Sequence, residues 1–458
     1  MRIVLLGICL GGLVQAQAQM KVSSWVTDPA QKVFFTHQTG KATGDKGSVT
    51  INVSPSKSYQ TIDGYGWALT GGSAQHIIHM SAPARAALLK DLFSTEGNHI
   101  GGSYLRVSIG ASDLNDHVFS YDDLPEGQTD TAMAHFDLGP DKQDVIPVLK
   151  EVLAIYPSLK ILGSPWSAPA WMKDNHDTRG GSLKREYYGV YARYFVKYIR
   201  AMAKEGIRID AITVQNEPLH PGNTPSMYMP AAEEGRFVKE SLGPVFKRAG
   251  IKTKIIIYDH NADRPDYPIS ILNDPEARPF IDGSAFHLYG GKIEALSQVH
   301  DAYPSKNIYF TEQWVGAPGH MDRDIREHVR NLIIGATRNW SKTVIEWNLS
   351  SNPTLTPHTD NGGCDRCLGA VSIDGDKVTR NPAYYIIAHA AKFVPPGSVR
   401  IASTIGDGLP NVAFRTPERK MVLIVLNDSP AEKEFWIGAG GRKVHTRLGA
   451  GAVATYVW

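Results

Sequence analysis

Short apolar runs alternate with longer segments of helical periodicity between residues 60 and 395. A short apolar run bounded by polar residues is typical of a buried strand, whereas apolar positions every three or four residues indicate a helix. The clearest helical segment is residues 187–202, where aromatic and aliphatic side chains recur on one face. The eight predicted strands cover residues 62–68, 103–109, 159–164, 208–215, 253–259, 283–288, 307–312 and 343–348.

Eight strands that alternate with helices over about 330 residues predict an α/β fold, the (β/α)8 TIM barrel, which commonly needs roughly 200 to 400 residues. The alternative is an open, doubly wound sheet, which usually carries a glycine-rich phosphate loop after its first strand. Here the first predicted strand belongs to GYGWALTGG, which lacks both the G-x-G-x-x-G spacing and a basic residue. The sequence therefore favours the closed barrel and argues against a nucleotide site.

The two ends of the chain follow a different pattern. Residues 47–60 and 398–458 alternate without a helical period, and MVLIVLND, KEFWIG and GAVATYVW are typical of strands. We therefore predict a side β-domain, similar to a β-sandwich, that both termini build beside the barrel. The expected boundaries are 19–61 and 395–458 for the side domain and 62–394 for the barrel.

The first 18 residues have the pattern of a secretory signal. Arg2 precedes an apolar run at residues 3–14, and the small-residue pattern AQA at residues 16–18 follows where a signal peptidase would cut. The run is too short to span a bilayer. We expect residues 1–18 to be removed and the protein to be secreted or periplasmic. A buried N-terminal strand or helix is the alternative.

The charge balance excludes some partners. The chain has 48 Lys and Arg residues against 46 Asp and Glu residues, and it contains no long run of either sign. Such a balance gives no reason to expect nucleic acid or an anionic membrane surface as a partner. No segment predicts a membrane span.

Cysteine is scarce, and one of the three cysteines, Cys9, lies inside the predicted signal. The other two, Cys364 and Cys367, are close together in GGCDRCLG. In an exported protein a close pair is expected to form a disulfide. Half of a zinc site, with His358 nearby, is the alternative, but no second cysteine pair exists to complete a four-thiolate site.

Polar and aromatic side chains gather at the carboxyl ends of the predicted strands, where active sites form in TIM barrels. Glu217 and Glu312 each follow an apolar strand that should carry the carboxylate into a walled pocket. They end the fourth and seventh strands, which face each other across the mouth of a closed barrel. The other residues at strand ends are Arg106, Asp113, Trp166, Asn216, Asp259 to Asn261, Tyr289, Trp347 and Asn348.

Two facing carboxylates suit glycoside hydrolysis. When the carboxyl groups are about 5–5.5 Å apart, one can attack the anomeric carbon while the other protonates the leaving oxygen. Binding of Mg²⁺ or Ca²⁺ is the alternative, but it would require more oxygen ligands nearby. The neighbours here are Trp, Tyr and Asn, so the sequence predicts a carbohydrate substrate and no metal or other cofactor.

The chain also resembles a known family. The segments GYGWALTGGSAQ, YLRVSIGASDL, GSPWSAPAWMK, NEP, FHLY, FTEQW, EWNLSSNP and NPAYYIIAHAAKFVPPGSVR follow one another in this order. Together they resemble glycoside hydrolase family 30, the family of lysosomal glucosylceramidase and of microbial β-1,6-glucanases. The resemblance covers most of the mature chain and implies a retaining (β/α)8 glycosidase with a side β-domain.

The resemblance also implies a role for each site residue. Glu217, in the NEP segment, would be the general acid/base, and Glu312 would be the nucleophile. Asn216 would bind the sugar 2-hydroxyl, and Tyr289 would hold the Glu312 carboxylate. The glucose subsite would be lined by Arg106, Asp113, Trp166 and Trp347. For the two tryptophans, packing in the core is the alternative.

The resemblance implies a retaining enzyme that cleaves β-glucosidic bonds. The loop PLHPGNTPSMYM after the fourth strand and the loop with the cysteine pair resemble the glucanase branch of the family more than the lysosomal lipid hydrolase, so we favour β-1,6-glucan as the substrate. The alternatives are an exo-acting β-glucosidase, a glucosylceramidase-type enzyme, a non-catalytic carbohydrate-binding protein and a purely structural barrel. Glu346 and the segment Tyr258 to Asn261 depart from the glucosylceramidase pattern and leave the natural substrate open. In the free enzyme we expect Glu312 to be ionised and Glu217 to be protonated, because two close carboxylates resist double ionisation.

Overall fold

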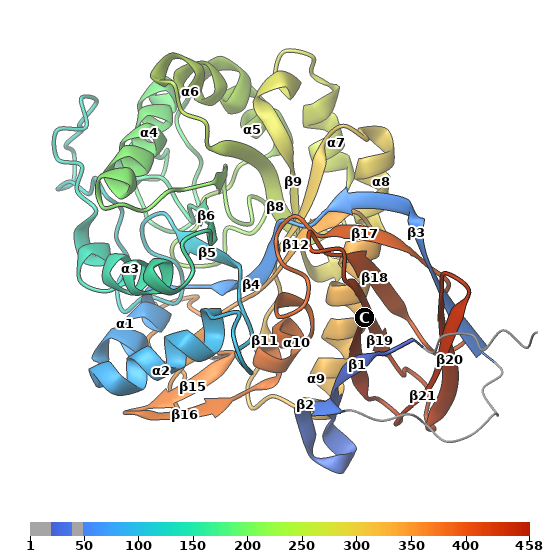
Figure 1. The fold of residues 1–458 in the computed structure, drawn as a ribbon. Helices are drawn as coiled ribbons and strands as arrows, with labels where there is room; N and C mark the ends of the chain where they lie inside the picture. The colour runs from blue at the N-terminus through green and yellow to red at the C-terminus, as the bar shows by residue number, and fades with distance from the viewer. Residues whose placement is uncertain (1–19, 39–48) are drawn as a thin grey trace, which may run out of the picture.

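The computed structural model describes residues 20–38 and 49–458, so the predicted signal segment lies outside the described residues. The chain forms a barrel surrounded by helices, with a β-domain at its side (Figure 1). Within the described part of the chain, no helix has both the length and the apolar character needed to cross a bilayer.

Eight parallel strands close into a barrel, so the predicted fold is confirmed and the open sheet is excluded. All eight predicted strands are present, although the fourth is shorter than expected and the fifth and sixth are longer. In chain order they are β4 (Gly64–Ala68), β5 (Tyr104–Ser108), β6 (Lys160–Ser164), β7 (Ala211–Thr213), β8 (Lys254–Ala262), β9 (Ile281–Gly291), β10 (Asn307–Glu312) and β12 (Ser341–Glu346).

Helices cover the outside of the barrel (Figure 1). The longest, α4 (Tyr188–Lys204), matches the predicted helix, and its tyrosine stripe at Tyr191, Tyr194 and Tyr198 is buried in the core. Gly206, with φ +81°, follows its end in the left-handed region that favours glycine. The others are α1 (Gly71–His79), α2 (Ala82–Phe93), α3 (Val145–Ile155), α5 (Ala231–Phe237), α6 (Gly243–Ala249), α7 (Asp266–Asn273), α8 (Ala295–Ala302), α9 (Met321–His328) and α10 (Pro382–Ala391).

Strands from both ends of the chain build the side domain, as predicted. They form one nine-stranded sheet that curls around its own apolar core, in the order β2-β1-β22-β19-β18-β17-β3-β20-β21. Its strands are β1 (Ser23–Asp28), β2 (Val33–Gln38), β3 (Val49–Thr61), β17 (Val399–Ser403), β18 (Asn411–Arg415), β19 (Met421–Leu426), β20 (Lys433–Ala439), β21 (Arg442–Leu448) and β22 (Val453–Val457).

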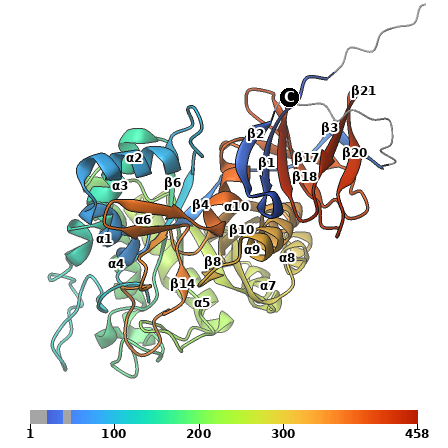
Figure 2. The same cartoon turned by 90° about the horizontal axis from the view of Figure 1, so that it is seen from below.

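Helix α10 joins the side domain to the barrel (Figure 2). The buried His389 on this helix makes hydrogen bonds to Thr27 and Thr455, one from each terminal part of the β-domain, at 2.8 and 2.9 Å. These bonds hold both terminal parts of the β-domain against helix α10.

The segment after β12 is a long insertion at the mouth of the barrel. It contains the short strands β13 (Ser350–Ser351), β14 (Cys367–Leu368), β15 (Val371–Asp374) and β16 (Lys377–Arg380) before α10 begins. Strand β14 pairs with β11 (Val315–Gly316), which follows the seventh barrel strand. This pairing fixes the cysteine-containing loop beside Glu312.

Candidate active site

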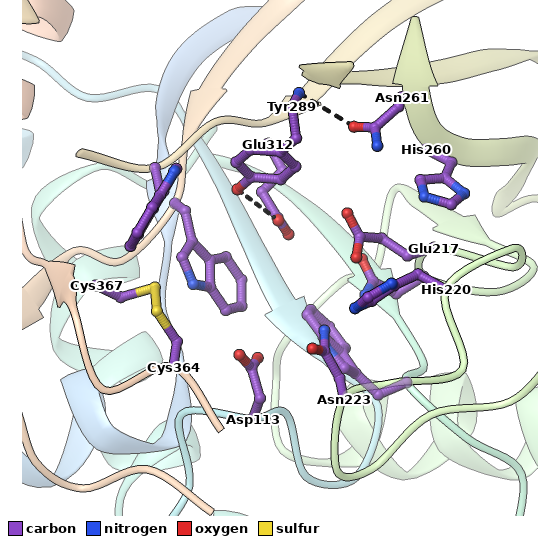
Figure 3. A pocket seen from close by; sticks show the side chains of 14 residues that line it. Asp113, Glu217, His220, Asn223, His260, Asn261, Tyr289, Glu312, Cys364 and Cys367 are labelled. Carbon is purple, nitrogen blue, oxygen red and sulfur yellow. Dashed lines mark hydrogen bonds between the residues drawn. A yellow bond between two sulfur atoms is a disulfide. The ribbon is translucent and has the colours of Figure 1, made fainter. Parts of the chain in front are cut away.

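A cavity of about 370 Å³ opens at the carboxyl ends of the barrel strands, where the sequence predicted the site. Figure 3 shows Glu217, from the loop after β7, and Glu312, at the end of β10, pointing into it. Its walls consist of acidic, amide, imidazole and aromatic side chains. They are Asp113, Trp166, Asn216, Glu217, His220, Asn223, His260, Asn261, Tyr289, Glu312, Trp314, Trp347, Cys364 and Cys367.

The two predicted catalytic carboxylates are close together. An oxygen atom of Glu217 lies within 4.8 Å of one of Glu312, and both side chains are buried. Inverting glycosidases keep their carboxyl groups about 6.5–9.5 Å apart to admit a water molecule, whereas retaining ones place them about 5–5.5 Å apart. The structure therefore brings both carboxyl groups to one place in the cavity, as the sequence predicted.

Arg106 does not line the cavity as expected, because its side chain is fully buried beneath it. Its guanidinium donates to Glu312 Oε2 at 2.5 Å and to Asn216 Oδ1 at 2.7 Å. The second bond orients the Asn216 amide, so that its Nδ2 group is left for a ligand. Arg106 therefore positions two site residues from behind instead of touching the substrate itself.

Tyr289 holds the other oxygen of Glu312. Its hydroxyl donates to Glu312 Oε1 at 2.9 Å, as Figure 3 shows, while 40% of the residue remains exposed. The backbone N–H of Tyr289 in turn donates to Asn261 Oδ1 at 3.1 Å. With Arg106 on Oε2, the Glu312 carboxylate is therefore fixed through both oxygens.

Two residues to which the sequence reading gave no role connect these groups. His287 Nδ1 lies 3.1 Å from Glu217 Oε1, and its Nε2 lies 3.1 Å from Asp259 Oδ1. Asp259 also accepts from Arg106 at 2.8 Å and from Thr311 at 2.6 Å, and it is fully buried. One signal was available, because His287 stands two positions before Tyr289 and alternate strand residues share a face.

Asp259 owes its position to an irregularity in β8. The pairing register between β8 and β9 shifts between Tyr258 and His260, and both Tyr258 and Asp259 have positive φ values of 75° and 60°. Such values are uncommon outside glycine and are costly for bulky side chains. The backbone carbonyl of Asp259 accepts from the N–H of Glu217 at 3.0 Å, so the strained turn also fixes the backbone of Glu217.

These contacts set the protonation of the site. Burial acts to lower the pKa of His287, but the charges of Glu312 and Asp259 and the hydrogen bonds to Asp259 and Glu217 raise it to about 9. Burial acts to raise the pKa of Glu217, but the hydrogen bond and charge of His287 leave it below its usual value. Burial raises the pKa of Glu312. The charges of His287 and Arg106 act to lower this pKa, but they do not reverse the shift.

The expectation that Glu217 is protonated in the free enzyme is therefore wrong for the resting site. The physical reason is His287, whose raised pKa favours the charged imidazolium beside Glu217 Oε1. Because His287 Nδ1 and Glu217 Oε1 are 3.1 Å apart, one proton can move along this hydrogen bond between the two residues.

Trp166 and Trp347 form an aromatic wall of the cavity. Their rings stack with centroids 5.4 Å apart, and the Arg106 guanidinium lies 4.9 Å from the Trp166 ring. Both are almost fully buried, yet both line the cavity, so packing and ligand contact are combined. Asp113 adds a carboxyl group to the cavity. Its burial, together with the charges of Glu312 and Glu217, raises its pKa to about 7.

Glu346, which departs from the glucosylceramidase pattern, points away from the cavity. Its carboxylate accepts from His328 Nδ1 at 2.8 Å and is fully buried. This residue therefore links a barrel strand to the surrounding helices and does not contact a ligand.

Glu217, His287 and Glu312 form the one set of side chains in residues 20–38 and 49–458 that could converge on a metal ion. With a pKa of about 9, His287 is protonated at neutral pH and offers no free lone pair to a metal. Arg106 already neutralises Glu312. In this structure the hydrogen bond between His287 and Glu217 and the ion pair between Arg106 and Glu312 already satisfy these groups.

Cys364 and Cys367 form a disulfide, so their thiolates are not zinc ligands in this structure. We predict that replacing both cysteines by serine lowers the global stability only slightly. The bridge spans a sequence separation of 3, whereas closing a 15-residue loop contributes about 3 kcal/mol. A thermal melt should show a small shift, and hydrogen exchange should rise mainly around residues 359–367. Loss of cooperative folding would contradict this prediction.

Replacing Asp259 by asparagine should shift the pH dependence of the enzyme. The buried Arg106 and His287 would lose a shared anion, so the pKa of His287 should fall from about 9. Removal of an opposite charge at this range shifts a pKa by about 1–3 units, so the basic limb of kcat/KM should move down by that amount. Stability should fall by about 3–5 kcal/mol, as for a broken buried ion pair.

The sign of the stability effect can be checked in the same variant. Because His287 has a raised pKa, its pairing stabilises the fold below pH ~6.5 and is lost as the pH rises through about 9. The matched control is Asp63→Asn, which removes a carboxylate paired with Lys160 at 3.1 Å at the opposite end of the barrel. The Asp63→Asn control should lose stability, but the basic limb of its kcat/KM pH profile should not move. Identical pH profiles for Asp259→Asn and wild type would contradict the role of Asp259.

The geometry defines the class of the protein. Two buried carboxyl groups reach the same cavity, with an oxygen of one within 4.8 Å of an oxygen of the other, and the tryptophan wall offers the apolar faces that sugar C–H groups contact. With the closed barrel, these features are those of a glycoside hydrolase.

Comparison with known families gives the assignment. The description "Glycosyl hydrolase family 30 TIM-barrel domain" matches residues 62–394, and "Glycosyl hydrolase family 30 beta sandwich domain" matches residues 397–456. The chain belongs to glycoside hydrolase family 30, so the resemblance predicted from the sequence segments is confirmed.

Several named relatives are similar over nearly the whole chain. An endo-1,6-beta-D-glucanase of Neurospora crassa is 34% identical over 439 residues, covering 91% of this chain and 90% of the relative. The lysosomal acid glucosylceramidase of Mus musculus is 29% identical, covering 89% and 83%. The solved endo-beta1,6-glucanase BT3312 is 35% identical with a TM-score of 0.89, covering 96% of this chain and 99% of that one.

Proposed function

We propose that the protein is a retaining β-glycosidase that cleaves β-glucosidic bonds in β-1,6-glucan. The observation that carries the mechanism is the close approach of Glu217 and Glu312, within 4.8 Å between carboxylate oxygens. Glu312 attacks the anomeric carbon, and Glu217 donates a proton to the departing oxygen. Water, deprotonated by Glu217, then releases the sugar from Glu312.

His287 supplies the proton balance of the first step. In the resting site the imidazolium donates to the ionised Glu217, and transfer along this hydrogen bond produces a neutral imidazole and a carboxylic acid. The leaving oxygen takes that proton while Glu312 loses its charge by forming the ester bond. Glu217 is then an anion beside a neutral His287, which is the state that a general base requires.

The substrate assignment is supported by the relatives. The two named endo-1,6-glucanases described above are 34% and 35% identical to this chain, against 29% for the lysosomal glucosylceramidase. A glucosylceramide-type lipid is therefore the second candidate. The signal-like pattern of residues 1–18 supports export, which would bring the enzyme to an extracellular glucan.

The proposed substrate is tested by incubating the enzyme with β-1,6-glucan, β-1,3-glucan, gentiobiose, an aryl β-glucoside and glucosylceramide. We expect oligosaccharides of mixed length from β-1,6-glucan, with no turnover by the Glu312→Ala variant. Glucose as the sole product would indicate exo action. Turnover confined to glucosylceramide would contradict the polysaccharide assignment.

A further inference from the structure

The acid/base residue identifies the side of the cavity on which the leaving group lies. Glu217 must face the glycosidic oxygen to protonate it, so the group released sits beside Glu217 and away from the sugar that Glu312 attacks. Figure 3 shows His220 and His260 on the Glu217 side of the cavity, opposite the disulfide. His220 is tied to this position by its N–H, which donates to the Glu217 carbonyl at 2.9 Å.

We propose that His220, Asn223, His260 and Asn261 form a binding subsite for a second glucosyl unit, the one that carries the departing oxygen. This inference rests on the proposed β-glucanase function and names the residues that select a sugar as the leaving group. All four residues line the cavity, and they come from the loop after β7 and the end of β8.

These side chains have unused hydrogen-bonding capacity. Within the part of the chain that the structure describes, the side chains of His220 and Asn223 make no hydrogen bond. Asn261 accepts through Oδ1 from Tyr289, which leaves its Nδ2 group for a ligand. Sugar hydroxyls can satisfy such donors and acceptors, whereas unpaired polar groups would be costly against an acyl chain.

His260 is a neutral hydrogen-bonding group at the pH where the enzyme would work. Its Nδ1 accepts from the N–H of Leu219 at 3.4 Å, which leaves the proton on Nε2. Burial lowers the pKa of His260 to about 4, so the ring carries no charge above that pH. A neutral imidazole with a free N–H suits a sugar hydroxyl and does not require an anionic ligand.

The loop that carries the cysteine pair holds this subsite in place. Thr224 Oγ1 donates to the Asn361 carbonyl at 2.6 Å, and Thr359 Oγ1 donates to the Thr224 carbonyl. The two loops approach so closely that a Cβ on Gly362 would lie 2.6 Å from the carbonyl oxygen of Gly222. Asn223 is therefore fixed by a loop from the opposite side of the barrel.

Gly222 also leaves room for the imidazole of His220. A Cβ at this position would lie 3.1 Å from His220 Cε1, which is tighter than most real contacts. The backbone of the loop thus positions both polar side chains, His220 by local packing and Asn223 through the contact with residues 361 and 362.

The test compares two substrates that share the attacked glucose and differ in the leaving group. Gentiotriose presents a glucosyl unit to the proposed subsite, whereas 2,4-dinitrophenyl β-glucoside presents an aryl group without hydroxyls. For His220→Ala and Asn223→Ala, the ratio of kcat/KM for gentiotriose to that for the aryl glucoside should fall about tenfold each, as expected for a lost hydrogen bond.

The matched control is Tyr228→Phe, on the same loop but outside the cavity lining, which should keep the wild-type ratio. A parallel loss on both substrates, or an unchanged ratio in both alanine variants, would overturn the subsite. Thermal melts of all variants confirm that a changed ratio does not arise from partial unfolding. Failure of the wild type to cleave gentiotriose while it cleaves glucosylceramide would overturn the proposed substrate, and the sugar subsite with it.

Discussion

Replacing Glu312 by alanine should reduce kcat for every β-glucoside by about 10⁴-fold or more, the scale seen when a covalent nucleophile is removed. Glu312 ends β10, and Arg106 at 2.5 Å and Tyr289 at 2.9 Å fix the two oxygens of its carboxylate. Asp259 is also held through both carboxylate oxygens, but it is fully buried and does not line the cavity. The measurement is kcat on an aryl β-glucoside with protein of confirmed fold.

Two additional observations make this result specific. Glu346→Gln, at the end of the neighbouring strand, removes a buried carboxylate that faces His328 and should retain turnover. In the wild type, a 2-deoxy-2-fluoro-β-glucoside should accumulate as an ester, and peptide mapping should find the label on Glu312. A label on another residue, or full activity in Glu312→Ala, would contradict the assignment.

Replacing Glu217 by alanine should have an effect that depends on the leaving group. General acid catalysis contributes about 10²–10⁴-fold, and this help is needed most by a poor leaving group such as a sugar alcohol. Turnover of gentio-oligosaccharides should therefore fall by that amount. Cleavage of 2,4-dinitrophenyl β-glucoside should begin normally and then stall, because no base remains to activate water for the second step.

Azide should restore part of the turnover on the dinitrophenyl substrate. The small anion can occupy the space that the side chain leaves and attack the sugar without a general base, producing a β-glucosyl azide. The β-glucosyl azide identifies Glu217 as the acid/base. Azide can form this product only if it attacks from the face of the sugar that the leaving oxygen occupied, where the removed side chain acted. An α-azide, or equal losses on both substrates, would contradict the role of Glu217.

Much of the fold follows from local patterns in the sequence. The eight strand runs predict the barrel because each is a short apolar segment followed by a helical one, and the counting of strands places Glu217 and Glu312 on facing strands. The side domain is predicted less completely. The curled nine-stranded sheet depends on β3 pairing with β17 and β20, contacts between distant segments that a local pattern does not encode.

The site was predicted in its outline but not in its electrostatics. The strand ends identify the residues that reach the mouth of the barrel, but not which of them stay beneath the cavity. Arg106 is drawn down because three acceptors, Asp259, Glu312 and Asn216, converge on its guanidinium. His287 was missed because its effect depends on the distances to Glu217 and Asp259, which no spacing in the sequence specifies.

The stereochemistry of the first-formed product tests the central claim most directly. A wild-type reaction with gentiotriose should be followed by ¹H NMR from the first seconds, before the anomers of the released sugar equilibrate. Because Glu312 and Glu217 lie within 4.8 Å of each other, the account predicts double displacement and therefore a β-anomeric product at the earliest times. Initial appearance of the α-anomer would show single displacement by water and would contradict the retaining mechanism.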